Sequence, residues 1–104
     1  MADVAASIGP TLLTTSAVTV FTAGAGGAVL RNLHASNGTG SNSTVTLSIG
    51  ADAVGTRFWD VKPVSKSGTS VDWSGFVPIA PGAIVQASAG AASTIVLTGG
   101  AVQL

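Results

Sequence analysis

The sequence contains no cysteine, no tyrosine and no glutamate, and it has a single histidine, His34. Without cysteine, neither a disulfide framework nor a thiolate zinc site can form. A domain of 104 residues must then draw its stability from one apolar core, or from neighbours in an assembly. One histidine cannot form a zinc site within one chain, so we expect no metal and no cofactor.

Charge is almost as scarce. Only 8% of the residues are charged and the formal net charge is zero, whereas about a quarter of the residues of a typical soluble protein are charged. Nucleic-acid binding requires clustered Lys and Arg, which excludes that class of partner here. Two interpretations of the surface stay open: much of it is covered by partner subunits, or Ser and Thr hydroxyls keep it hydrated. The charged residues are Asp3, Asp52, Asp60, Asp72, Arg31, Arg57, Lys62 and Lys66.

Long apolar runs are also missing. No stretch approaches the roughly 20 apolar residues of a membrane-spanning helix. The segment that begins at Met1 has neither the basic nor the apolar region of a signal peptide. The sequence therefore predicts no membrane partner and synthesis in the cytoplasm.

Short runs rich in Val and Thr, separated by Gly, Ser and Asn, dominate what is present, and turn signals recur about every 8–12 residues. This spacing predicts a single all-β sandwich of about eight or nine short strands, of jelly-roll or Greek-key-like type. Residues 28–104 form its body, and residues 1–27 form an N-terminal arm and the first strands of the same unit. The expected strands are Thr11–Thr15, Ala17–Thr22, Ala28–Ser36, Thr44–Ile49, Arg57–Val61, Ser70–Trp73, Gly75–Ile79, Ile84–Ala89, Thr94–Thr98 and Ala101–Leu104.

Alternation assigns faces within two of these strands. Val45, Leu47 and Ile49 should face one way in Thr44–Ile49, which is typical of a half-buried strand. In the segment Ala28–Ser36, one face should carry Val29, Leu33 and Ala35, with His34 on the opposite face.

Candidate interface residues come from the aromatic and apolar positions. Phe58 and Trp59 are adjacent, so a strand directs them to opposite faces. One should lie in the core, and the other either reaches an interface or is covered within the same chain. The apolar pair Leu12 and Leu13 ends a segment, Ala2–Leu13, that we expect to pack on a neighbouring subunit.

Few residues could carry chemistry. His34 has no Gly-x-Ser-x-Gly nucleophile to activate, so we expect no catalytic residue. The glycine-rich run at 23–27 lacks the spacing of a phosphate loop. The sequons at Asn37 and Asn42 are interpreted as loop composition. Trp73 beside Asp72 could stack on a carbohydrate, although a buried Trp that closes the sandwich is the alternative.

Two longer segments together resemble small β-sandwich proteins of tailed bacteriophages. The first runs from Ala28 to Ile49, with a Gly/Ser/Asn loop before a Thr/Val strand, and the second is Val71-Asp-Trp-Ser-Gly-Phe-Val-Pro-Ile-Ala-Pro-Gly-Ala-Ile-Val-Gln-Ala-Ser-Ala. The resemblance covers about three quarters of the chain, from near Ala28 to the end.

This resemblance implies a virion accessory protein without catalytic residues. We expect a capsid decoration or cement protein that binds the head lattice as a homo-oligomer, with a trimer favoured. Its partners would be the major capsid or tail proteins and its location the virion. A receptor- or glycan-binding module on the tail is the alternative.

Overall fold

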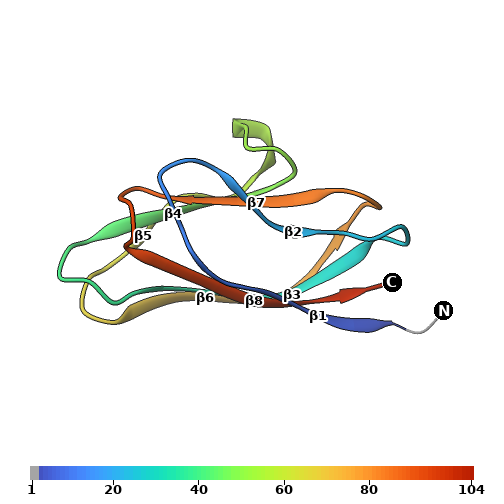
Figure 1. Cartoon of the computed structure of the whole chain (residues 1–104), viewed down its shortest axis with the longest axis horizontal. Coiled ribbons are helices and arrows are strands. Elements are labelled where there is room, and N and C mark those ends of the chain that lie inside the picture. Colours follow the sequence, from blue (N-terminus) through green and yellow to red (C-terminus); the bar gives the residue numbers. More distant parts are fainter. Residues whose placement is uncertain (1–2) are drawn as a thin grey trace.

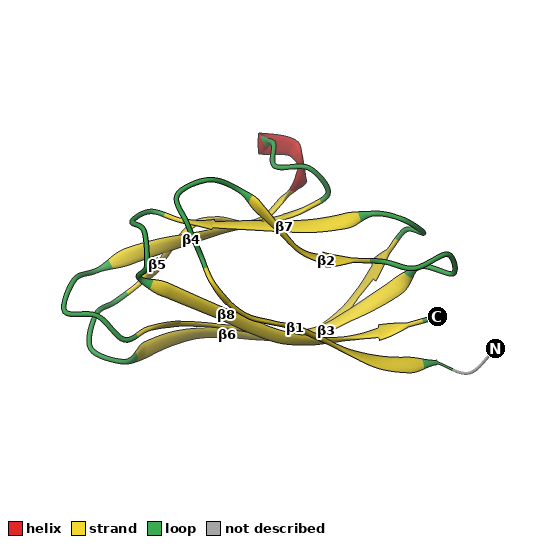
Figure 2. Cartoon of the chain, in the orientation of Figure 1, coloured by secondary structure: helices red, strands yellow, loops and turns green. Residues whose placement is uncertain are grey.

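The computed structural model describes residues 3–104, which form eight β-strands and one short 3-10 helix (Figures 1 and 2). The elements are β1 (Val4–Leu12), β2 (Val18–Thr22), β3 (Ala28–Asn37), β4 (Ser43–Ile49), η1 (Val54–Thr56), β5 (Arg57–Val64), β6 (Thr69–Ile79), β7 (Ile84–Ala89) and β8 (Ile95–Gln103). No helix in this part of the chain is long and apolar enough to cross a membrane.

The strands form two four-stranded sheets, with the orders β1-β8-β3-β6 and β2-β7-β4-β5. Every pairing within the sheets is antiparallel, and the last long strand, β8, lies between β1 and β3. Figure 1 shows the two sheets stacked face to face. The prediction of one all-β sandwich of jelly-roll or Greek-key-like type is confirmed.

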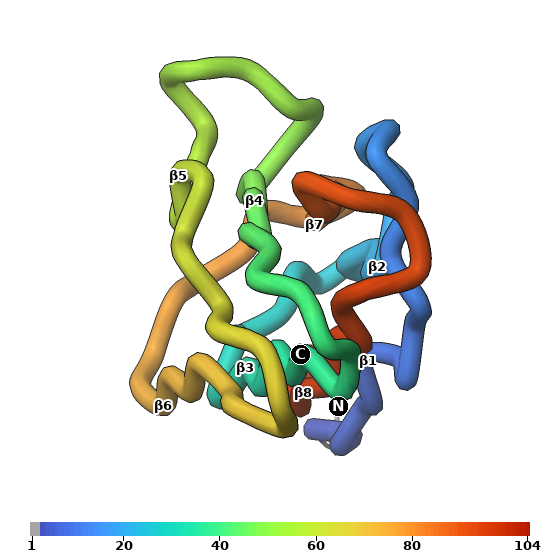
Figure 3. Tube along the Cα trace, turned by 90° about the vertical axis from the view of Figure 1, so that its left-hand side faces the viewer, coloured from blue at the N-terminus to red at the C-terminus, as the bar shows by residue number. Residues whose placement is uncertain are grey.

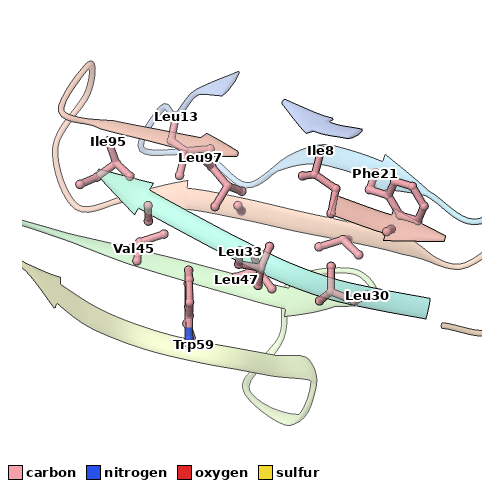
Figure 4. Packing of buried hydrophobic residues seen from close by; sticks show 14 of the residues in the cluster. Ile8, Leu13, Phe21, Leu30, Leu33, Val45, Leu47, Trp59, Ile95 and Leu97 are labelled. Carbon is pink, nitrogen blue, oxygen red and sulfur yellow. The ribbon is translucent and has the colours of Figure 1, made fainter. Parts of the chain in front are cut away.

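One core fills the space between the sheets (Figure 4). Leu33 on β3 is 1% exposed, and Leu47 on β4, in the opposite sheet, is fully buried. Val45 and Leu47 lie on the buried face of β4, as the alternation predicts, and Ile49 packs against the core while partly exposed. Burial of aliphatic side chains of this kind is the main source of stability in a domain without disulfides.

The predicted face of β3 is wrong at its first residue. The pairing of β3 with β8 shifts register between Leu30 and Asn32, so Arg31 is an extra residue of β3 relative to β8. Such a bulge reverses the alternation, because the side-chain period of a strand is two. Leu30, rather than Val29, therefore shares the core face with Leu33 and Ala35.

The predicted strands divide β6 at Ser74 and β8 at Gly99 and Gly100, but the structure has one continuous strand in each place. A Cβ atom on Gly75 would lie 2.7 Å from Cζ2 of Trp73, and one on Gly99 would lie 2.5 Å from the carbonyl oxygen of Asn32. Gly100 lies under the side chain of Asn32. These glycines lie inside strands because neighbouring atoms leave little room for a side chain.

The first strand begins earlier than the sequence predicted. Val4–Leu12 pairs with β8 of the same chain, and Ala2 of the expected arm lies outside the described residues. Small residues and the Gly9–Pro10 pair hide the alternation of this edge strand. The segment Thr11–Thr15 was predicted as a strand, but β1 ends at Leu12 and the next strand begins at Val18.

Candidate functional site

Polar side chains gather in a hollow on the outer face of the sheet β1-β8-β3-β6, meaning the face that turns away from the other sheet. The hollow has a volume of about 280 Å³ and lies between β3 and the edge strand β6. Two cross-strand pairs flank it, Asn32 with Ser74 and His34 with Asp72. Its lining residues are Asn32, Leu33, His34, Asp72, Trp73 and Ser74.

The pair His34 and Asp72 carries the electrostatics of the hollow. Nδ1 of His34 lies in hydrogen-bond contact with Oδ1 of Asp72, and the two side chains are 46% and 62% exposed. The Ser70 hydroxyl donates to the other carboxylate oxygen, Oδ2, over 2.9 Å. The hydrogen bond from His34, helped by the one from Ser70, holds the pKa of the Asp72 carboxyl below its usual value.

This arrangement differs from a hydrolytic triad. In a triad the serine hydroxyl is hydrogen-bonded to the imidazole, which removes its proton. Here the Ser70 hydroxyl is hydrogen-bonded to the carboxylate. The residues of the hollow can bind a polar group, but the one hydroxyl that joins the network is not placed for activation by His34.

Trp73 does not offer its ring to this hollow. Successive residues of a strand point to opposite faces, so Trp73 points toward the core side while Asp72 and Ser74 point outward. The ring of Trp73 packs against the core, over Gly75 and edge-to-face with Phe58, at 5.0 Å between ring centroids and an interplanar angle of 79°. Its position matches the alternative in which a Trp closes the sandwich.

The candidate interface residues divide into two groups. Leu13 is fully buried and Trp59 is 7% exposed, and both belong to the core (Figure 4). Their own chain covers them: a backbone hydrogen bond to Ile95, of 2.9 Å, holds Leu13 beside β8, and Trp59 lies on the inner face of β5. The prediction that these two residues face a partner therefore needs correction.

The other two interface candidates lie at the surface. Leu12 is 55% exposed on β1. Phe58 is half-buried on β5, where its ring contacts those of Trp59 and Trp73. Of the adjacent pair Phe58 and Trp59, Trp59 is thus the core residue and Phe58 the more exposed one.

A second polar cluster braces the loop that rises above the other sheet, at the top of Figure 1. Arg57 donates to Asp52 over 3.2 Å and to Asp60 over 2.8 Å, and the Ser48 hydroxyl donates to Asp52 over 2.8 Å. The Arg57 hydrogen bond is the main reason that the pKa of Asp52 is lowered and the pKa of Arg57 is raised. These residues pair with one another, and among the described residues no group of three metal-ligating side chains occurs.

No sequence pattern pointed to Asn32 or to the role of Asn37. Asn37 is fully buried at the end of β3, and its amide nitrogen donates to the carbonyl oxygens of Ser41 and Val64. A glycan cannot be attached to a buried amide that is engaged in this way. The sequon at Asn37 is therefore part of the fold.

Comparison with known proteins gives similarity at the level of fold. Neither a protein-family model nor a curated protein matches the sequence. A virus-like particle of the extra small virus of the giant freshwater prawn Macrobrachium rosenbergii aligns with 97% of this chain and 75% of that chain, at 11% identity and a TM-score of 0.51. The capsid asymmetric unit of cyanophage Pam1 aligns with 96% of this chain and 79% of that chain, at 15% identity and a TM-score of 0.48. At 11% identity the first likeness shows that this chain has the same fold as a chain of that particle.

Proposed function

We propose that this chain is a non-enzymatic structural protein of a tailed-bacteriophage virion, a capsid decoration or cement protein that binds the head lattice as a homo-oligomer, with a trimer as the expected assembly. It is made in the host cytoplasm and then resides on the virion. Its partners are copies of itself and the major capsid protein. No nucleic acid, membrane or cofactor takes part.

The observation that carries this proposal is the exposure of large apolar side chains on a surface with few charges. Such side chains on a domain with a net charge of zero favour association. Burying them between subunits desolvates few charges, which keeps the cost of association low. Among these residues are Val4 and Leu12 on β1, Val61 on β5 and Phe76 on β6.

Two further findings support this proposal. The fold is shared with a chain of a virus-like particle. The Ser70 hydroxyl is held by Asp72 rather than by the imidazole of His34, which favours a non-enzymatic role.

The test is the location of the protein in particles of the virus that encodes it. We expect mass spectrometry of separated heads and tails to find the chain in the head fraction. The purified protein should be oligomeric and should co-sediment with heads that lack it. A protein that stays monomeric and does not bind heads would overturn the proposal.

The hollow beside His34 favours a second candidate, a receptor- or glycan-binding module on the tail. Its polar side chains, Asn32, His34, Asp72 and Ser74, could donate to and accept from sugar hydroxyls. If this candidate is right, the protein is found in the tail fraction and binds a glycan array. Asn32→Ala should then abolish glycan binding, whereas Val54→Ala, on the exposed helix η1, should retain it.

A further inference from the structure

The sandwich has two lateral sides, each formed by two unpaired edge strands. β1 and β2 form one side, and β5 and β6 form the other (Figure 3). An edge strand presents a row of backbone N–H and C=O groups without partners from its own sheet. Proteins that stay monomeric usually protect such edges with charges, prolines, bulges or short strands.

The side formed by β1 and β2 has little of this protection along its first half. Neither strand contains a charged residue. Val4–Ile8 pairs with β8 in unbroken register, and the shift that contains Gly9 and Pro10 comes only after it. The edge of Val4–Ile8 is therefore regular and uncharged.

The edge of β6 is equally regular over Thr69–Ser74, which pairs with β3 without a shift. Asp72 is the only charged residue of the eleven in β6, and it is already paired with His34. On β5, Arg57 is paired with Asp52 and Asp60. A contact on this side would therefore break no ion pair that these residues make within the chain.

Both sides also carry exposed apolar side chains. Val4 and Leu12 are 59% and 55% exposed on β1, and Val61 and Phe76 are 53% and 64% exposed on β5 and β6. Of the four aromatic residues on β5 and β6, Trp59 and Trp73 pack against the core, whereas Phe58 is half-buried and Phe76 is exposed. Aromatic residues are enriched at the centres of protein interfaces, so Phe76, with Phe58 beside the core, gives this side an anchor for a contact.

We propose that the β5/β6 side of one copy packs against the β1/β2 side of a second copy, with β6 adding to β1 so that the sheet continues from copy to copy. This contact rests on the homo-oligomeric part of the proposed function. A second copy is the fitting partner because the same chain supplies both regular edges and both apolar sides. Contact between two β5/β6 sides would leave Val4 and Leu12 uncovered.

Such a contact is heterologous, since it joins two different surfaces, and it repeats from copy to copy, forming a ring where the rotation between copies closes. One row of paired residues crosses all four strands of this sheet, from β1 through β8 and β3 to β6. Its members are Ser7, Gly100, Asn32 and Ser74. Ser7 on β1 and Ser74 on β6 are exposed at the two ends of that row. In the continued sheet, Ser74 of one copy approaches β1 of the next.

Cysteine cross-linking tests this arrangement directly, because the chain has no cysteine of its own. Ser7→Cys and Ser74→Cys proteins are prepared separately, mixed, and treated with a short bismaleimide. We expect a cross-linked dimer from the mixture and none from either protein alone. Ala53→Cys, in the exposed loop before η1, is the matched control and should not be cross-linked to Ser7→Cys.

Substitutions that introduce a charge test the same contact through the mass of the oligomer in solution. Phe76→Asp and Leu12→Asp should each raise the dissociation constant of the oligomer about tenfold or more in light scattering. Val54→Asp should leave it unchanged, because Val54 is 83% exposed on η1, outside both sides. Circular dichroism checks that each variant is folded.

Three outcomes would overturn the lateral contact: strong cross-linking of Ser74→Cys to itself, no cross-linking of the mixture, or a monomer in light scattering. Binding of the unmodified protein to heads shows whether the lateral contact alone is wrong or the proposed function is wrong as well. Self-cross-linking with intact head binding means that only the lateral contact is wrong. A lateral ring that is absent from virions means that only the proposed location is wrong.

Discussion

The side chain of Asn37, at the end of β3, donates its amide to the carbonyl oxygen of Val64, at the end of β5, over 3.2 Å. β3 and β5 belong to opposite sheets, so this buried hydrogen bond joins the two layers directly. The same amide donates to Ser41, and its oxygen accepts from the backbone N–H and the hydroxyl of Thr39. One buried side chain thus determines both the loop after β3 and the spacing of the sheets at this end.

Substitution of Asn37 should therefore destabilise the fold. Asn37→Ala leaves the Val64 carbonyl without its donor, which costs about 1–3 kcal/mol of unfolding free energy. Asn37→Asp should cost more, because a carboxylate replaces a donor that faces two carbonyl oxygens. Urea denaturation measures both. Asn42→Asp is the control, since the Asn42 oxygen only accepts a hydrogen bond from the Lys66 backbone, and its stability should change little.

Alanine at Gly99 should destabilise the pairing of β8 with β3. Its Cβ would lie 2.5 Å from the backbone oxygen of Asn32, which cannot move without disturbing the sheet. Overpacking of this kind typically costs about 1–3 kcal/mol. Gly38→Ala is the matched control, because no atom lies within 4 Å of the added Cβ. Equal melting temperatures for the two variants would contradict the close approach seen here.

Truncation in the core should have the largest effect on stability. Leu33→Ala removes a side chain that is 1% exposed between the two sheets, and we expect a loss of about 2–5 kcal/mol. Val54→Ala should change the free energy of unfolding by less than about 0.5 kcal/mol, because Val54 is 83% exposed. Denaturant titration of both proteins, with the oligomeric state recorded, compares them.

Acid should remove the stabilisation that Asp52 provides. Its pKa is lower in the folded protein than its ordinary value of 3.8, chiefly because of Arg57. A carboxyl with a lowered folded pKa contributes stability above the unfolded pKa, and this contribution is lost as the pH falls below 3.8 toward the folded value.

Stability measured from pH 7 down to pH 2 should therefore fall less steeply in Asp52→Asn than in the unmodified protein, in the range below pH 4. Lys66→Met, on a residue outside the ion pairs of the described chain, is the control and should keep the original slope. An unchanged slope in Asp52→Asn would show that the ion pair does not contribute.

The extent of sequence prediction differs between strands of the same sheet. The alternation of β4 was readable because Val45 and Leu47 are separated by hydroxyl residues, which reports a strand with one buried face. β1 was not readable, because its small side chains carry little alternation and its pairing with β8 joins opposite ends of the chain. A strand of that kind is recognised only through its distant partner.

The candidate site shows the same limit. The sequence identified His34 as the one titratable ring and placed it on the face opposite Leu33, which the structure confirms. The sequence could not predict that His34 contacts Asp72. That contact depends on the pairing register of β3 with β6, and the two residues are 38 positions apart in the chain. Nor could it predict that the ring of Trp73 contacts Phe58, which lies on the other sheet.

By itself, the sequence determined the class of the fold and the small number of side chains that could take part in chemistry. Val and Thr alternation between frequent turn residues specifies strands locally, and a chain with one histidine, no cysteine and eight charged residues has few groups from which to build an active site. Tertiary structure decided which residues meet: the bulge at Arg31, the Asn37 bridge between the sheets, and the burial of Leu13 and Trp59. The physical reason is that burial and register arise from contacts between distant segments, whereas strand propensity acts between neighbours along the chain.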